Sequence, residues 1–226
     1  MIEHIDRYFI DLLFGSQSAV LDHFALVITD AWTWLPLYIA LFVLIIKNHD
    51  NMQQIAICFG CAVLGVLIAT GLTSVITKPL FERIRPCNDP EFKYLADIAG
   101  NFHSNDYSFF SSHAATTMSL AMFFAYLTKS KLLTFFMVCW SLSLCWSRLY
   151  LGQHFFTDIS VGFVWGIISG SIAFLIYRRF CLRLYNVKYA ISERYTPSGI
   201  DKFDIEVIVL ILLLTYIYAI VTPLNY

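Results

Sequence analysis

The chain has 226 residues, of which 58% are hydrophobic and 14% charged, and its mean hydropathy is +0.67. This is far more apolar than a soluble domain of this length needs to be, so the composition predicts an integral membrane protein. The formal net charge of -1 offers no basic surface for a nucleic acid, which excludes that class of partner.

The first segment in chain order, residues 1–23, places acidic residues among Ile, Leu and Phe. This pattern predicts an amphipathic helix that lies on the membrane surface. The segment lacks the basic start and the small-residue cleavage site of a signal peptide.

Six apolar segments follow, and each is long enough, or nearly so, to cross a hydrocarbon core of about 30 Å. They are residues 25–46, 54–77, 112–128, 132–147, 157–177 and 205–222. Asp30 falls inside the first of them, and we expect Pro36 to kink it. We therefore predict an all-α, polytopic membrane helix bundle with about six transmembrane helices, formed by one domain that covers residues 1–226.

The loops between these segments differ in charge. The loops after the first, third and fifth segments contain most of the basic residues: Lys47, Lys129, Lys131, Arg178, Arg179, Arg183, Lys188, Arg194 and Lys202. The positive-inside rule places these loops in the cytoplasm. We therefore predict a multi-pass membrane protein with its other loops facing outward.

Three polar clusters lie at the ends of segments that should face outward. Lys78 and Arg85-Pro86 follow the second segment, Ser111-Ser112-His113 opens the third, and Ser147-Arg148, His154 and Asp158 lie between the fourth and fifth. A charged group near the bilayer centre costs roughly 2.5–3.5 kcal/mol, so these residues belong at an interface. Because all three clusters face the same side, they can meet in one pocket.

Such a pocket suits a phosphate. Two arginine forks and a lysine match a tetrahedral oxyanion, and Ser111 before a helix offers a hydroxyl and the first backbone N–H groups. His154 and Asp158 are four residues apart, so on a helix they would share a face and the carboxylate would orient the imidazole. His154 then acts as a nucleophile and His113 as the acid for the leaving group.

The three clusters resemble the signature motifs of the type 2 phosphatidic acid phosphatase superfamily. The motifs are Lys78-x6-Arg85-Pro86, Ser111-x-His113 and Ser147-Arg148-x5-His154-x3-Asp158, within residues 78–158. The resemblance implies an all-α bundle without metal or other cofactor. It also implies His154 as nucleophile, Asp158 as its orienting partner and His113 as general acid, with phosphate bound by Lys78, Arg85, Ser111, Arg148 and the backbone near Ser112.

The second motif departs from the family pattern. Members commonly have Pro-Ser-Gly-His where this chain has Phe110-Ser111-Ser112-His113. The change removes a rigid turn and limits backbone freedom where the phosphate approaches, but it keeps the N–H donors. The Ser112 hydroxyl either caps the helix or contacts the phosphate, and the sequence favours the cap.

Alternative interpretations remain for several residues. Arg148 can be a snorkelling interfacial residue and Lys78 a helix-end anchor, and Arg83 can pair with Glu82 or touch a headgroup. Gly162, Gly166 and Gly170 form a small-residue stripe that favours packing within the chain over a dimer seam.

The function also has rivals. A binding protein or transporter for phosphorylated lipids needs the same cations, and a metal-dependent intramembrane hydrolase is a third class. The resemblance to bacterial members of the family implies a protein of the inner membrane whose active site faces the periplasm. It also implies, as partners, the bilayer and a membrane lipid substrate such as lipid A or undecaprenyl diphosphate, with phosphatidylglycerophosphate or phosphatidic acid as alternatives. The sequence does not indicate an oligomeric state.

Overall fold

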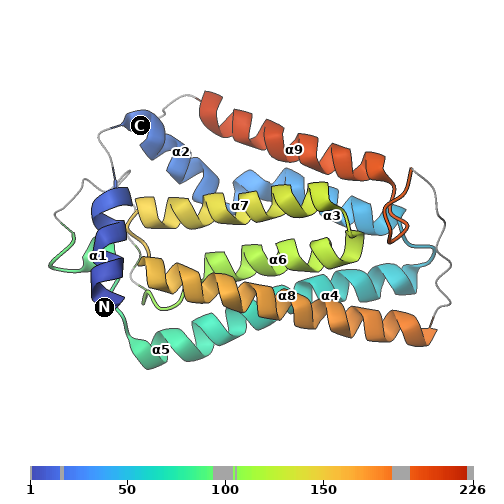
Figure 1. Ribbon diagram of the computed structural model, residues 1–226, viewed down its shortest axis with the longest axis horizontal. Helices are drawn as coiled ribbons and strands as arrows, with labels where there is room; N and C mark the ends of the chain where they lie inside the picture. Colours follow the sequence, from blue (N-terminus) through green and yellow to red (C-terminus); the bar gives the residue numbers. More distant parts are fainter. Residues whose placement is uncertain (1, 16–17, 94–103, 105, 185–193, 223–226) are drawn as a thin grey trace.

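The computed structural model describes residues 2–15, 18–93, 104, 106–184 and 194–222. Nearly all of them lie in helices or in short connections between helices, with one isolated β-bridge between Tyr195 and Asp201. The predicted all-α polytopic bundle is therefore confirmed (Figure 1).

The long helices are α4 (Met52–Thr70), α6 (Ser112–Thr128), α7 (Lys131–Tyr150), α8 (Phe156–Leu184) and α9 (Lys202–Val221). Among the described residues, four helices are long and apolar enough to cross a membrane, and a bent pair makes a fifth if it counts as one span. The remaining predicted span, α6, has 17 residues and packs against α4, α7 and α8. The chain is a multi-pass membrane protein, and the count of six stays a prediction.

The first predicted span is a bent pair, not one continuous helix. It consists of α2 (Ala19–Thr29), the 3-10 turn η1 (Ala31–Trp34) and α3 (Leu35–Lys47), with an angle of 67° at the break. Asp30 causes the break because its extended backbone ends α2 and its side chain accepts a hydrogen bond from Trp32 N at 3.1 Å. The kink predicted at Pro36 is wrong, because this proline lies in the first turn of α3, where its missing N–H costs nothing.

The amphipathic N-terminal segment is shorter than predicted. Its helix, α1 (Ile2–Leu13), crosses one end of the bundle at a steep angle and contacts α7 and α8 (Figure 1). Residues 19–23 belong instead to α2. The buried side of α1 carries Asp6, Ile10 and, just beyond the helix, Phe14.

The centre of the bundle is the contact between α6 and α8. An added Cβ at Gly162, Gly166 or Gly170 would lie 2.3–2.6 Å from backbone oxygens of α6 or its N-cap. The glycine stripe therefore packs within the chain, as predicted, because only glycine allows this close approach.

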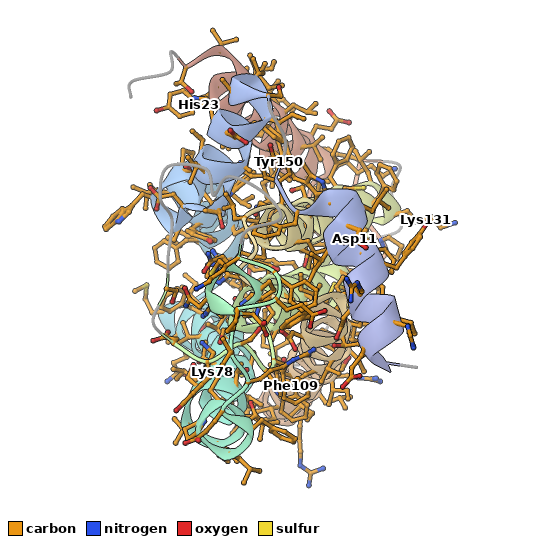
Figure 2. All side chains as sticks on the ribbon, turned by 90° about the vertical axis from the view of Figure 1, so that its left-hand side faces the viewer. Asp11, His23, Lys78, Phe109, Lys131 and Tyr150 are labelled. Atoms are coloured by element: carbon orange, nitrogen blue, oxygen red, sulfur yellow. The ribbon has the colours of Figure 1, made fainter. Side chains whose placement is uncertain are left out.

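The second predicted span continues past α4 through a π-helical stretch, Gly71–Thr77, into the short helix α5 (Lys78–Phe81). Glu82 then takes a left-handed conformation with φ 44° and ends the helix. A 3-10 turn, η3 (Pro86–Asn88), follows Arg85. The first motif is thus spread over a helix end and a turn at the end of the bundle that α1 crosses. Figure 2 looks onto this end, with Lys78, Phe109 and Tyr150 labelled.

Candidate active site

A cleft of about 680 Å³ lies at the end of the bundle that α1 crosses. Six of the eight side chains predicted from the sequence line it: Lys78, Arg85, Ser112, His113, Arg148 and His154. They come from α5, the turn before η3, α6, α7 and the connection between α7 and α8. The structure therefore brings residues from all three motifs into one cavity.

Two of the cations of the cleft are buried and donate hydrogen bonds to neutral groups. Arg85 is 3% exposed and donates from Nε to the Asp106 carbonyl at 2.8 Å and from Nη1 to the Gln153 carbonyl at 2.9 Å. Arg148 is 4% exposed and donates from Nη1 to Thr29 Oγ1 at 3.1 Å. Both guanidinium groups line the cleft, which is therefore suited to an anion.

Lys78 supplies the third cation. Its Nζ lies 3.7 Å from Oδ2 of Asp106, whose side chain is 71% exposed. Because such an exposed pair is weak, the lysine can exchange this carboxylate for a phosphate oxygen.

His154 lies in the turn between α7 and α8, before the first residue of α8. The prediction that it shares a helix face with Asp158 is therefore wrong. Its Nε2 faces Nη1 of Arg85 at 3.5 Å, and its Nδ1 lies 3.4 Å from Oγ of Ser108. A guanidinium can only donate, so Nε2 presents its lone pair to the cleft and Nδ1 carries the proton.

Asp158 acts on this imidazole through Ser108. Its Oδ2 is 3.8 Å from Nδ1 of His154, too long for a hydrogen bond, while the Ser108 hydroxyl donates to the same oxygen. The chain of donors thus runs from His154 to Ser108 to Asp158. Burial lowers the pKa of His154 to about 3, against the opposing effect of Asp158, so the imidazole is neutral at neutral pH.

The second motif forms the N-terminus of α6. Ser111 is fully buried and is the N-cap, since its hydroxyl accepts from Ala114 N at 3.4 Å and its own N–H donates to the Asp158 carbonyl at 3.1 Å. Ser111 is not among the residues that line the cleft, and its predicted phosphate contact stays a prediction.

Ser112 does not cap α6, so the favoured interpretation of its hydroxyl is wrong. The side chain lines the cleft, 3.5 Å from the Ser74 hydroxyl. The amides of Ser112 and His113 lie in the first turn of α6, where the helix provides no acceptor, and they remain suited to an anion.

The carboxylate of Asp158 has no exposed surface and is fixed by three donors: Arg83 Nη1 at 2.5 Å, Phe155 N at 2.9 Å and the Ser108 hydroxyl. The contacts of Ser108 and Arg83 with Asp158 were not predicted from the sequence. The predicted partners of Arg83 were Glu82 or a headgroup. One sequence feature could have indicated a role for Arg83 in the site, namely its position inside the first motif. Ser108 had none, because its partners lie 46 and 50 residues away.

Among the residues that the structure describes, no group of three or more His, Cys, Asp or Glu side chains is placed to hold a metal ion. The metal independence implied by the resemblance stays a prediction.

The chain is similar to a known protein family and to several named proteins. Residues 59–182 match the PAP2 superfamily. A Porphyromonas gingivalis protein named lipid A 4'-phosphatase is 32% identical over 179 residues, which cover 78% of this chain and 74% of the relative. A Bacteroides thetaiotaomicron protein of the same name is 28% identical, with 81% of each chain covered.

A Haemophilus influenzae protein named phosphatidylglycerophosphatase B is 30% identical over 63% of this chain and 74% of the relative. No solved structure matches. The family match covers more than half of the chain and contains all three motifs, which confirms the predicted resemblance. The chain therefore belongs to the PAP2 superfamily.

Proposed function

We propose that this protein is a lipid phosphatase that hydrolyses a phosphate ester through a phosphohistidine on His154. The observation that carries the proposal is the buried imidazole, whose Nδ1 is directed at Ser108 and whose Nε2 faces a cleft lined by Lys78, Arg85 and Arg148. A cationic cleft alone would serve a binding protein, but an oriented nucleophile is needed only for turnover.

In the first step the phosphate oxygens bind to the three cations and to the first-turn amides of α6. Nε2 of His154 attacks phosphorus, the bond from phosphorus to the ester oxygen breaks, and His113 gives its proton to the departing lipid hydroxyl. The Nδ1 proton stays directed at Ser108 and Asp158, which stabilise the positive charge that develops on the imidazole.

In the second step a water molecule takes the place of the alcohol. His113, now neutral, accepts a proton from this water as it attacks phosphorus, and the bond between phosphorus and Nε2 breaks. Inorganic phosphate leaves and both histidines return to their starting protonation states. The scheme needs one neutral and one protonated histidine, so we expect a bell-shaped dependence of the rate on pH.

Lipid A is the substrate that we propose, hydrolysed at the periplasmic face of the inner membrane. The names of the Porphyromonas gingivalis and Bacteroides thetaiotaomicron relatives support this choice, and the basic loops at the opposite end of the bundle support the orientation. The acyl chains would stay in the bilayer while the phosphate enters the cleft. Phosphatidylglycerophosphate is the second candidate because of the Haemophilus relative.

The deciding experiment measures phosphate release by the purified protein in detergent from lipid A, phosphatidylglycerophosphate, undecaprenyl diphosphate and phosphatidic acid. We expect lipid A to be the best substrate and chelators to have no effect. His154→Ala should reduce release by about 10⁴-fold or more while substrate still binds. His49→Ala is the matched control, because this histidine lies beyond α3 at the other end of the bundle.

Brief incubation of the wild type with lipid A labelled in its phosphate should leave acid-labile label on the protein, and none on His154→Ala. Release at the wild-type rate from that variant would refute the nucleophile. Tight binding without any release by the wild type would favour a lipid-binding protein or transporter, and loss of activity with a chelator would favour a metal-dependent hydrolase.

A further inference from the structure

Helix α1 is joined to the segment that carries His154. Ile10 and Phe14 form a buried cluster with Phe155, and the rings of Phe9 and Phe156 stack with their centroids 3.8 Å apart. The backbone N–H of Gly15, just past α1, donates to the Tyr150 carbonyl at 2.9 Å. These contacts hold α1 against both sides of the turn between α7 and α8.

One charged side chain of α1 is buried in this contact. Asp6 is 2% exposed and accepts three hydrogen bonds: from Thr157 N at 2.9 Å, from Thr157 Oγ1 at 2.7 Å and from Arg83 Nη2 at 2.6 Å. Thr157 lies in the first turn of α8, where backbone N–H groups have no partner within the helix. Asp6 therefore caps α8 from another helix, one residue before Asp158.

Arg83 links Asp6 to the catalytic carboxylate. Its Nη1 donates to Asp158 Oδ1 at 2.5 Å and to Thr157 Oγ1 at 2.9 Å, and its guanidinium lies 3.9 Å from the centre of the Phe155 ring. The planar guanidinium of Arg83 thus bridges the carboxylates of Asp6 and Asp158, so the position of each carboxylate depends on the other.

The charges give Asp6 a second effect. A cation paired with Asp158 alone would neutralise the carboxylate that must stabilise the positive charge on His154. Arg83 shares its single charge between Asp6 and Asp158, so the group of three keeps one net negative charge beside the imidazole. Removing the charge of Asp6 would leave a neutral pair.

We propose that Asp6 is a positioning residue of the active site, which sets Arg83 and the first turn of α8 so that Asp158, through Ser108, can hold His154. The inference rests on the proposed phosphatase function. It extends the site to a helix outside residues 59–182, the part of the chain that matches the family.

The test compares Asp6→Asn with Asp11→Asn, the same chemical change on the same helix at an exposed position (Figure 2). Phosphate release from lipid A should show a kcat that is about 10–100-fold lower for Asp6→Asn, the range seen when an outer partner of a functional group is lost. The KM should change by less than about twofold, because Asp6 does not line the cleft that binds phosphate. Asp11→Asn should match the wild type.

A double-mutant cycle separates positioning from general loss of stability. If Asp6 acts through Arg83, the kcat of Asp6→Asn combined with Arg83→Gln should equal that of Arg83→Gln alone. Thr157→Val, which removes the shared hydroxyl and keeps the volume, should also lower kcat at constant KM, and it tests the same link if Asp6→Asn does not fold. Wild-type kcat in Asp6→Asn or Thr157→Val, or additive effects in the cycle, would overturn the inference.

Hydrogen–deuterium exchange tests the arrangement without any catalysis. The backbone amides of Phe155 and Thr157 donate to Asp158 and Asp6, so exchange across residues 153–158 should be faster in Asp6→Asn than in Asp11→Asn. Unchanged exchange would refute the role of Asp6 even if the wild type released no phosphate. An inactive wild type with faster exchange in Asp6→Asn would refute only the phosphatase proposal.

Discussion

The two ends of the bundle differ in how far their charged side chains are buried. At the end that α1 crosses, five aspartate, arginine and histidine residues are at most 4% exposed: Asp6, Arg85, Arg148, His154 and Asp158. At the other end, the ion pairs Lys47 to Asp204 and Arg194 to Asp201 each have a basic side chain that is more than half exposed.

This difference in burial distinguishes charges that serve a site from charges that lie in solvent. Exposed pairs contribute little to stability and leave their charges in water, as is usual for loops beside a membrane. A buried ion carries a desolvation penalty of several kcal/mol, which hydrogen bonds must offset. The end that α1 crosses carries that penalty four times, for Asp6, Arg85, Arg148 and Asp158, beside the buried imidazole of His154. The cleft that results is lined by cations and an imidazole, which suits an anion.

The largest difference in activity between variants of the two ends should come from substitution of one arginine at each end. Arg85→Lys keeps the charge but loses the fork that bonds Asp106 and Gln153 and that we propose for phosphate binding, so we expect kcat/KM for lipid A to fall by about 10²–10³-fold. Arg194→Lys should leave it unchanged. Equal activity of the two variants in a phosphate-release assay would contradict a role for Arg85 in binding phosphate.

Glycines with positive φ provide a comparison of packing. Gly152 has φ 61° and an added Cβ would lie 2.3 Å from the Phe14 ring, whereas Gly199 has φ 87° and nothing within 4 Å. Both alanine variants carry backbone strain, but only Gly152→Ala also pushes α1 from the catalytic turn. We expect the free energy of unfolding in detergent to be about 1–3 kcal/mol lower for Gly152→Ala than for Gly199→Ala. Equal unfolding free energies would show that α1 is loosely held.

The smallest effect concerns acid. Because the pKa of His154 is lowered from 6.5 to about 3, the unfolded chain binds a proton in this range that the folded protein does not. The effect of this residue on the free energy of unfolding is therefore absent above pH 6.5. Below that pH it lowers the free energy of unfolding by about 1.4 kcal/mol per pH unit until the pH reaches about 3. Thermal unfolding from pH 7.5 to 5.5 should show a shallower decline for His154→Gln than for the wild type. Parallel declines would mean that His154 titrates normally in the fold.

Much of the active site could be predicted because its residues stand at helix ends in recognisable spacings. Lys78, Arg85, His113, Arg148 and His154 interrupt or border apolar segments, and the alternation of spans directs those ends to one side of the membrane. The prediction failed where it assumed local geometry. Ser111 satisfies its own helix, and His154 lies before α8, so Ser108 stands between it and Asp158.

By itself, the sequence determined the membrane class, the helical architecture and most of the residues that line the cleft, because apolar length and the order of the motifs are local properties of the chain. Tertiary structure alone decided the Ser108 link and the burial of Asp6 against Arg83 and Thr157. These features join residues up to 151 positions apart, and such pairings depend on how whole helices pack, which no spacing along the chain records.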